Sequence, residues 1–247
     1  MNLRKFAFGV AFIIVAVFAF TTFYPMNAHA EKAAEEPVAE ATTETATEVA
    51  NETTAEVATE EENKIKTPDD LEIFPVIGLG DPNAPVYLVE YASLSCSHCA
   101  EFHHSILPRL KEDYIDQGKV FIEFREYPTS KSGLDAVKLM RCMPFKRQYK
   151  FMDLLFQTQD MWAFTEDPTP LFQNAKLAGM TQESIDACLA DEEHELKIMN
   201  SIKNGKERYS VSSTPTVIAY PTNEKLKGLT NYKTIQKQID RALKAAE

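Results

Sequence analysis

The sequence has 247 residues and a net charge of −11, and this acidity is unevenly distributed. Residues 31–66 contain eleven Glu, three Lys and no Asp, so they carry −8, whereas residues 67–247 carry only −5. Nucleic acid is excluded as an expected partner, because binding to phosphates requires clustered Lys and Arg. The 181 residues from position 67 onward can bury one well-packed core, so we expect a single domain there.

The N-terminus has the pattern of an export signal. Arg4 and Lys5 precede an apolar run over residues 6–24, and Ala28-His29-Ala30 follows as an A-x-A cleavage site. This predicts a signal peptide over residues 1–30 and a periplasmic domain. The apolar run is long for a signal core, so retention of residues 6–24 as a membrane anchor is the alternative. In both cases the domain is exported to a compartment where disulfides persist.

Residues 31–66 repeat Ala, Thr, Val and Glu and contain no aromatic residue. Such a segment buries too little apolar surface to offset its ordering entropy, so we predict a disordered acidic tether. A helical, oligomerising stalk is the alternative. Its β-branched residues and the lack of an apolar heptad argue against a stalk.

The folded part starts with the turn formers of Gly80–Pro85, after which Val86–Tyr91 reads as a buried strand. A helix follows Cys96, with an expected kink at Pro108 and a stop at Gly118. Val120–Tyr127 alternates apolar and polar residues and predicts a second strand. Because a helix connects the two strands, we expect them to be parallel.

The first strand and its helix meet at Cys96-Ser97-His98-Cys99, which indicates a thiol/disulfide redox site. A helix N-terminus favours a thiolate, so Cys96 is the predicted nucleophile. Cys99 lies one turn further and is predicted to close the redox-active disulfide, while His98 is predicted to stabilise the Cys96 thiolate. Cys142 and Cys188 are predicted to form a structural disulfide, with two buried free thiols as the alternative.

A metal site is the competing interpretation, because Cys99 and His103 are four residues apart on one helix. A structural zinc site normally needs four ligands, and metal binding would compete with disulfide formation. We therefore predict neither metal nor cofactor, and we place His103 and His104 on the helix surface without a role. Trp162, Phe164 and Phe172 are expected in an apolar core rather than in a ligand site.

The remaining pattern is helical over residues 132–208 and then changes to strands. We predict helices over 132–142, 144–158, 169–178, 182–190 and 191–208. Thr216–Tyr220 and Lys225–Leu229 predict a hairpin, and residues 231–246 a closing helix. The order β-α-β, helices, β-β-α predicts an α/β thioredoxin-like fold over residues 67–247 with a helical insertion at about 132–208.

The sequence resembles the exported thiol:disulfide interchange proteins of the DsbA type, in the style of their α-proteobacterial members, from about Val76 to Ala246. The resemblance rests on Gly80–Pro85, Glu90–Cys99, Gly118–Val120 and Thr214–Thr216. It implies a cis-proline at Thr214-Pro215 beside the cysteines. It also implies that Glu90 is buried near Cys99 and mediates its proton transfer; a salt bridge at the strand end is the alternative. The middle dipeptide Ser-His departs from the Pro-His of the best-known oxidases.

The expected function is disulfide donation to reduced exported polypeptides by a monomer, with reoxidation by a DsbB-type membrane partner. A disulfide isomerase or reductase of the same fold is the first alternative. A periplasmic metal-binding module that uses the thiols and histidines is the second.

Overall fold

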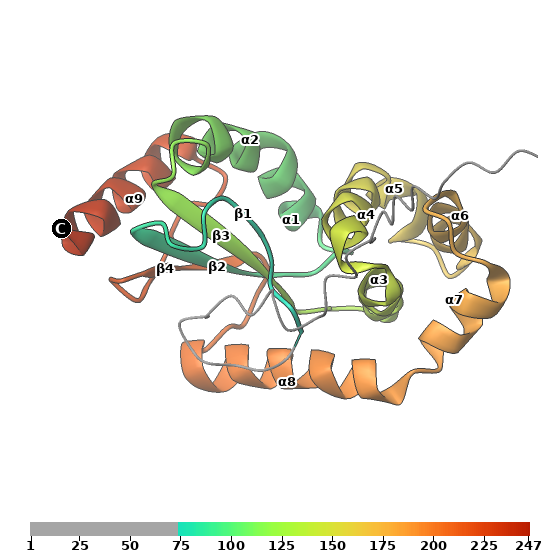
Figure 1. Ribbon diagram of the computed structural model, residues 1–247. Helices are drawn as coiled ribbons and strands as arrows, with labels where there is room; N and C mark the ends of the chain where they lie inside the picture. The colour runs from blue at the N-terminus through green and yellow to red at the C-terminus, as the bar shows by residue number, and fades with distance from the viewer. Residues whose placement is uncertain (1–73) are drawn as a thin grey trace, which may run out of the picture. The chain divides into compact units, whose positions relative to one another are not determined.

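The computed structural model describes residues 74–247, so the predicted signal peptide, membrane anchor and tether lie outside the described residues. The centre of the described unit is a five-stranded sheet with the order β1-β3-β2-β4-β5 (Figure 1). Its strands are β1 (Ile77–Leu79), β2 (Val86–Ala92), β3 (Val120–Glu126), β4 (Thr216–Tyr220) and β5 (Glu224–Lys225). Only β2 and β3 pair in parallel within this sheet, which confirms the orientation expected from the connecting helix.

Two strands differ from the prediction. β1 was not predicted, because three residues are too few to show a period; it pairs antiparallel with β3. A Cβ at Gly78 would lie 2.6 Å from the backbone oxygen of Ile122 on β3, so this strand needs a glycine for its close approach. β5 covers only Glu224–Lys225 and not the predicted Lys225–Leu229.

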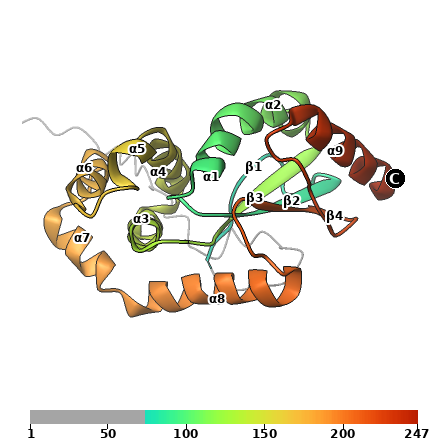
Figure 2. The same ribbon diagram turned by 180° about the vertical axis from the view of Figure 1, so that it is seen from behind.

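The two faces of the sheet are covered by different helices. Figures 1 and 2 show α1, α2 and α9 on one face and α8 on the other. Val86 and Leu88 pack into the core on the α1 and α9 side, whereas Tyr87, Val89 and Tyr91 pack with Tyr209 of α8. Side chains alternate along a strand, so Glu90 faces the same side as Leu88, beneath the helix that carries the cysteines.

That helix runs as α1 (Ser97–Glu101), η2 (Phe102–Ile106), α2 (Leu107–Leu110) and η3 (Lys111–Ile115), and both η segments are π-helical. Pro108 falls in the first turn of α2. A π-helical turn contains more residues than an α-helical turn and so shifts which side chains face inward. The consecutive residues Phe102 and His103 are both buried.

Six helices separate β3 from β4, which confirms a thioredoxin-like fold with inserted helices. They are α3 (Lys131–Cys142), α4 (Phe145–Gln157), α5 (Gln159–Trp162), α6 (Thr169–Leu177), α7 (Gln182–Leu189) and α8 (Glu192–Tyr209). The predicted helix 144–158 ends at Gln157, and α5 begins after Thr158. The closing helix is α9 (Tyr232–Ala246).

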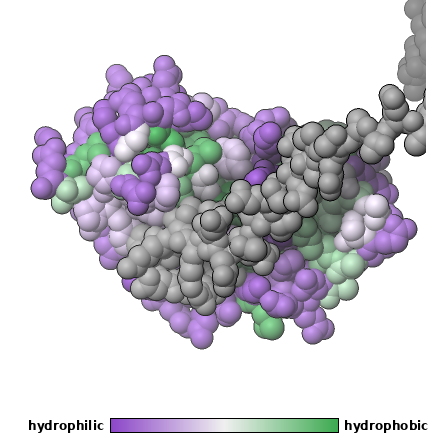
Figure 3. Space-filling view, in the orientation of Figure 1, coloured by the Kyte–Doolittle hydropathy of each residue, from purple (hydrophilic) through white to green (hydrophobic). Residues whose placement is uncertain are grey.

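Trp162 is buried as expected, but Phe164 is 63% exposed, so its assignment to the core was wrong. The segment that carries Phe164 runs between two helices on the surface of the insertion. In the view of Figure 3 most visible side chains of the described residues are hydrophilic. No helix within residues 74–247 combines the length and apolarity needed to cross a membrane.

Candidate active site

Cys96 and Cys99 lie where β2 gives way to α1. Cys96 is the N-cap residue of α1, with an extended backbone, and is half-buried; Cys99 is in the first turn and fully buried. Both are free thiols in this structure. The backbone N–H groups of Cys99 and Ala100 donate to the Cys96 carbonyl at 3.0 and 3.1 Å. The helix therefore begins at the cysteine that the sequence predicts as nucleophile.

The environment of Cys96 favours its thiolate. A hydrogen bond from the Cys99 thiol is the largest influence. Together with a hydrogen bond from the Thr214 side chain and with the backbone N–H groups of Cys99 and His98, it lowers the pKa of Cys96 from 9.0 to about 5. Partial burial opposes this shift. At neutral pH Cys96 is therefore mainly a thiolate in the reduced protein.

The environment of Cys99 favours the thiol. Burial is the largest influence, and together with the hydrogen bond to Cys96 and the negative charge of Glu90 it raises the pKa of Cys99 far above its usual range. The two sulfurs thus differ strongly in acidity within one turn of helix. This difference supports Cys96 as the attacking sulfur and Cys99 as the sulfur that must gain or lose a proton.

The loop before β4 lies beside Cys96, although the two are far apart in the sequence. The Thr214-Pro215 peptide bond is cis, and the Cys96 thiol donates to the Thr214 carbonyl at 3.3 Å. This carbonyl accepts only from the protonated thiol and so opposes the lowering of the Cys96 pKa. The side chain of the same residue, Thr214, acts in the other direction and lowers that pKa. A groove of about 410 Å³ runs along this loop. Its lining includes His98, Ser213, Thr214, Pro215, Lys225 and Leu229.

His98 is exposed at the mouth of this groove. Its side chain is 71% exposed, and its Nδ1 lies 3.7 Å from Oε2 of Glu101. In this structure His98 lowers the pKa of Cys96 through its backbone N–H. Stabilisation of Cys96 by the imidazole ring stays a prediction.

Glu90 and His103 form a buried pair beneath α1. Oε2 of Glu90 lies 3.2 Å from Nε2 of His103, and the side chains are 0% and 3% exposed. Placing His103 on the helix surface was therefore wrong, whereas His104 is exposed as expected. The signal for burial was the position of His103 between Phe102 and Ile106 on the apolar face of the helix. His103 falls at the helical spacing of the buried residues Cys99, Phe102, Ile106 and Leu110.

The insertion also holds the cysteine loop in place. The side chain of Gln159 is buried, and its Nε2 donates to the carbonyls of Leu94 and Cys96 at 2.7 and 3.1 Å. Ser95 contacts Ser93 and Ser130 through hydroxyl groups at 3.1 and 2.8 Å. Sequence reasoning missed Gln159, because nothing near position 159 shows that this residue meets a loop 63 positions earlier.

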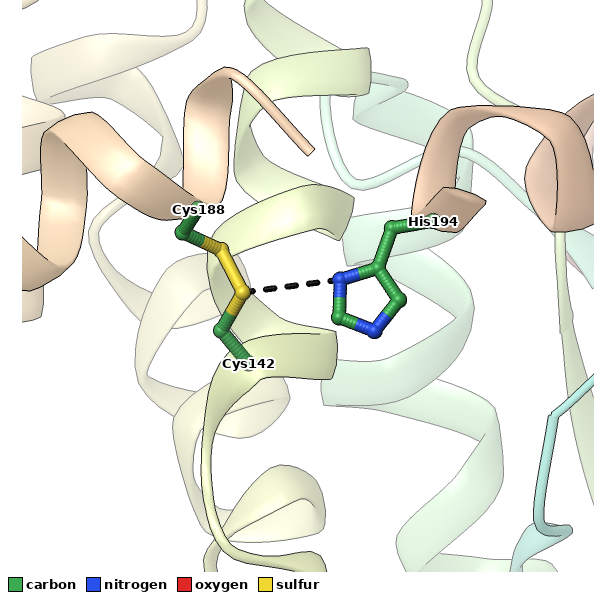
Figure 4. A group of neighbouring side chains, drawn as sticks. All are labelled: Cys142, Cys188 and His194. Carbon is green, nitrogen blue, oxygen red and sulfur yellow. Dashed lines mark hydrogen bonds between the residues drawn. A yellow bond between two sulfur atoms is a disulfide. The ribbon is translucent and has the colours of Figure 1, made fainter. Parts of the chain in front are cut away.

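Cys142 and Cys188 form a disulfide between the end of α3 and α7 (Figure 4). Nδ1 of His194, in the first turn of α8, lies 3.5 Å from Sγ of Cys142. These three side chains are the group within residues 74–247 close enough to share a metal ion. Sulfurs joined in a disulfide cannot act as thiolate ligands, so this arrangement gives the metal interpretation no support.

We expect a mild reductant to open the Cys96–Cys99 disulfide before the Cys142–Cys188 disulfide. A low pKa at Cys96 favours its release as a thiolate, whereas Cys188 is buried. Replacing Cys142 and Cys188 with Ala should lower the free energy of unfolding by about 2–4 kcal/mol, because the crosslink spans a sequence separation of 46 residues. Mass mapping and denaturant titration measure these two quantities. Simultaneous opening of both disulfides would contradict the expected order.

The chain resembles known proteins over most of the described region. The family model described as Thioredoxin matches residues 75–241. A Rickettsia bellii protein named for protein-disulfide oxidoreductase activity is 35% identical over 46% of this chain, and the aligned part is 45% of that protein. A Bacillus cereus protein named as a disulfide bond formation protein D is 28% identical over 67% of this chain and 78% of its own length.

The crystal structure of Wolbachia pipientis alpha-DsbA1 superposes with a TM-score of 0.64 and 29% identity. It covers 76% of this chain and 98% of the Wolbachia chain. The present chain thus matches less than half the length of the Rickettsia bellii relative but nearly all of the Wolbachia protein.

Proposed function

We propose that this protein is a thiol:disulfide oxidoreductase that introduces disulfides into exported proteins. The chain belongs to the thioredoxin family and to its DsbA-like group. The observation that carries this proposal is the pair of free cysteines with opposite acidities, Cys96 and Cys99, at the start of α1. An oxidant needs a reduced form that is stabilised, and a low pKa at Cys96 supplies that stabilisation.

The exchange proceeds in two steps. A substrate thiolate attacks Sγ of Cys96 in the oxidised protein, the Cys96–Cys99 bond breaks, and Cys99 leaves with the electron pair and takes up a proton. A second substrate thiolate then attacks the substrate sulfur of the mixed disulfide. This forms the substrate disulfide and releases Cys96 as a thiolate, so two electrons pass from substrate to protein.

The groove beside Cys96 is where we propose that the substrate binds. Residues 213–216 line it together with Lys225, and the exposed backbone before β4 offers hydrogen-bonding groups to an extended polypeptide. Only part of its lining is apolar, which suits unfolded substrates of varied sequence.

Localisation and partners follow from the same proposal. We place the mature domain in the periplasm as a monomer, downstream of a signal peptide over residues 1–30 and a tether over residues 31–66. If residues 6–24 are retained as a membrane anchor, the same periplasmic domain is attached to the membrane. A DsbB-type membrane protein is the proposed oxidant that restores the Cys96–Cys99 disulfide.

The equilibrium with glutathione tests the proposed direction of electron flow. A variant with Cys142→Ala and Cys188→Ala leaves one cysteine pair to titrate. We expect millimolar reduced glutathione to convert most of this pair to the dithiol, because a Cys96 pKa of about 5 stabilises the reduced form. Alkylation and mass measurement give the reduced fraction. A pair that stays oxidised under these conditions would identify a reductant and overturn the oxidase proposal.

A further inference from the structure

His103 is held tightly in the core under the cysteines. Its ring lies between aromatic rings of the sheet and the insertion, with centroid distances of 5.0 Å to Phe124 on β3 and 4.2 Å to Phe156 on α4. Its Nε2 contacts Oε2 of Glu90. The imidazole therefore has one carboxylate neighbour at hydrogen-bond distance and apolar packing around its ring.

Glu90 uses only one of its two carboxylate oxygens for a hydrogen bond. Oε2 contacts His103, whereas Oε1 accepts no hydrogen bond from any residue in the range 74–247, although it is fully buried. A buried polar atom without a partner is costly and is retained mainly where it has a function. Glu90 lies on the face of β2 that packs beneath the helix of Cys99, and it contacts His103 on that helix. Its negative charge raises the pKa of the buried Cys99 thiol.

The proposed exchange requires a proton at Cys99. When Cys99 leaves the disulfide it carries a negative charge in a fully buried position, and when it attacks a mixed disulfide it must first lose its proton. Tyr149 feels the charge of Glu90, and burial raises the pKa of its phenol to about 12. This phenol therefore stays protonated at neutral pH and does not take up the proton of Cys99. Glu90 is the buried carboxylate next to Cys99 that can exchange this proton.

We propose that His103 is a positioning residue for this proton exchange: its Nε2 holds Oε2 of Glu90 and leaves Oε1, which has no other partner among residues 74–247, to exchange a proton with the Cys99 thiol. This inference rests on the proposed function and extends it to a residue outside the Cys-Ser-His-Cys motif. The proton moves between Sγ of Cys99 and Oε1 of Glu90, and no electrons pass through His103. Without the His103 contact, neither oxygen of the buried carboxylate would have a donor to fix its orientation.

The test separates the chemistry of the two cysteines. Reduced protein is mixed with oxidised glutathione, and attack by the Cys96 thiolate forms the mixed disulfide and releases one glutathione. The rate at which the second glutathione is released reports attack by Cys99 on Cys96. Alkylation of Cys96 by iodoacetamide in the reduced protein reports the nucleophile alone. We expect His103→Leu to slow glutathione release on the order of 10- to 100-fold, with Cys96 alkylation unchanged. His103→Gln keeps an N–H donor and should remain within about threefold of the wild-type rate.

Two controls separate positioning from packing. His104→Gln alters the exposed neighbour on the same helix and should change neither rate. In a Glu90→Gln background, His103→Leu should cause no further loss of glutathione release, because the role of His103 runs through the carboxylate. Circular dichroism confirms that each variant is folded, and if His103→Leu does not fold, His103→Phe takes its place as the variant without a donor.

The outcomes distinguish the two levels of proposal. If folded His103→Leu protein releases glutathione as fast as the wild-type protein does, the role of His103 is overturned and the proposed function stays intact. Equal losses in His103→Gln and His103→Leu, or a further loss in the Glu90→Gln background, would also overturn it. A wild-type protein that neither forms nor releases the mixed disulfide would overturn the proposed function itself, and the role of His103 with it.

Discussion

Cys96→Ser is expected to reduce disulfide transfer to the rate of the reaction without protein. A serine hydroxyl does not ionise near neutral pH, whereas the pKa of Cys96 is lowered to about 5, and no S–S bond can form at an oxygen. The measurement is oxidation of a reduced two-cysteine peptide by stoichiometric oxidised protein. Cys99→Ala, when offered a peptide disulfide, should accumulate mixed disulfides: the Cys96 thiolate bonds to one peptide sulfur and releases the other as a thiolate, and Cys99 is absent to attack Cys96 in turn.

A variant with Cys142→Ser and Cys188→Ser is the matched control for these changes. It removes both sulfurs of the disulfide in the insertion and leaves the site at the start of α1 unaltered, so it should retain transfer activity. Undiminished peptide oxidation by the Cys96→Ser protein would refute the assignment of the nucleophile. Loss of activity in the control alone would indicate that Cys142 and Cys188 carry out the transfer.

The reduced protein is expected to melt at a higher temperature than the oxidised protein at neutral pH. Folding lowers the pKa of Cys96 from 9.0 to about 5, so its stabilisation is complete above pH 9, declines as the pH falls toward 5 and is absent below that. Cys99 has a raised pKa, and its contribution to stability is lost only above pH 9. The oxidised protein has neither contribution.

The difference in melting temperature should therefore shrink as the pH falls from about 7 to about 4. Cys96 is half-buried and solvent screening weakens the effect, but each kcal/mol corresponds to roughly 2–4 °C for a domain of this size. Thermal melts of both redox forms, with Cys142 and Cys188 kept bridged, give the comparison. An oxidised form that melts higher at neutral pH would contradict an oxidant and indicate a reductant.

Local patterns in the sequence were sufficient for most elements of the fold, though not for β1, and for the motif that the cysteines form. Runs such as Val86–Tyr91 are recognisable because the side-chain period of a strand is set by the backbone. The position of Cys96 at the strand-to-helix junction follows from the same two neighbouring patterns. These features depend on residues close in sequence, and for this reason the inserted helices other than the short α5 were predicted within a few residues of their observed ends.

Contacts between distant segments were decided only by the tertiary structure. His103 was misplaced, because the residues that bury it, Phe124 on β3 and Phe156 on α4, are distant in the sequence. Gln159 reaches the cysteine loop from the insertion, and Phe164 is exposed because its segment lies outside the core. An apolar pattern predicts which side of a helix or strand is buried. It does not predict the residues that pack there, because these come from another part of the chain. The pairing of Glu90 with His103 beneath Cys99 is therefore a property of the packed domain and of no single segment.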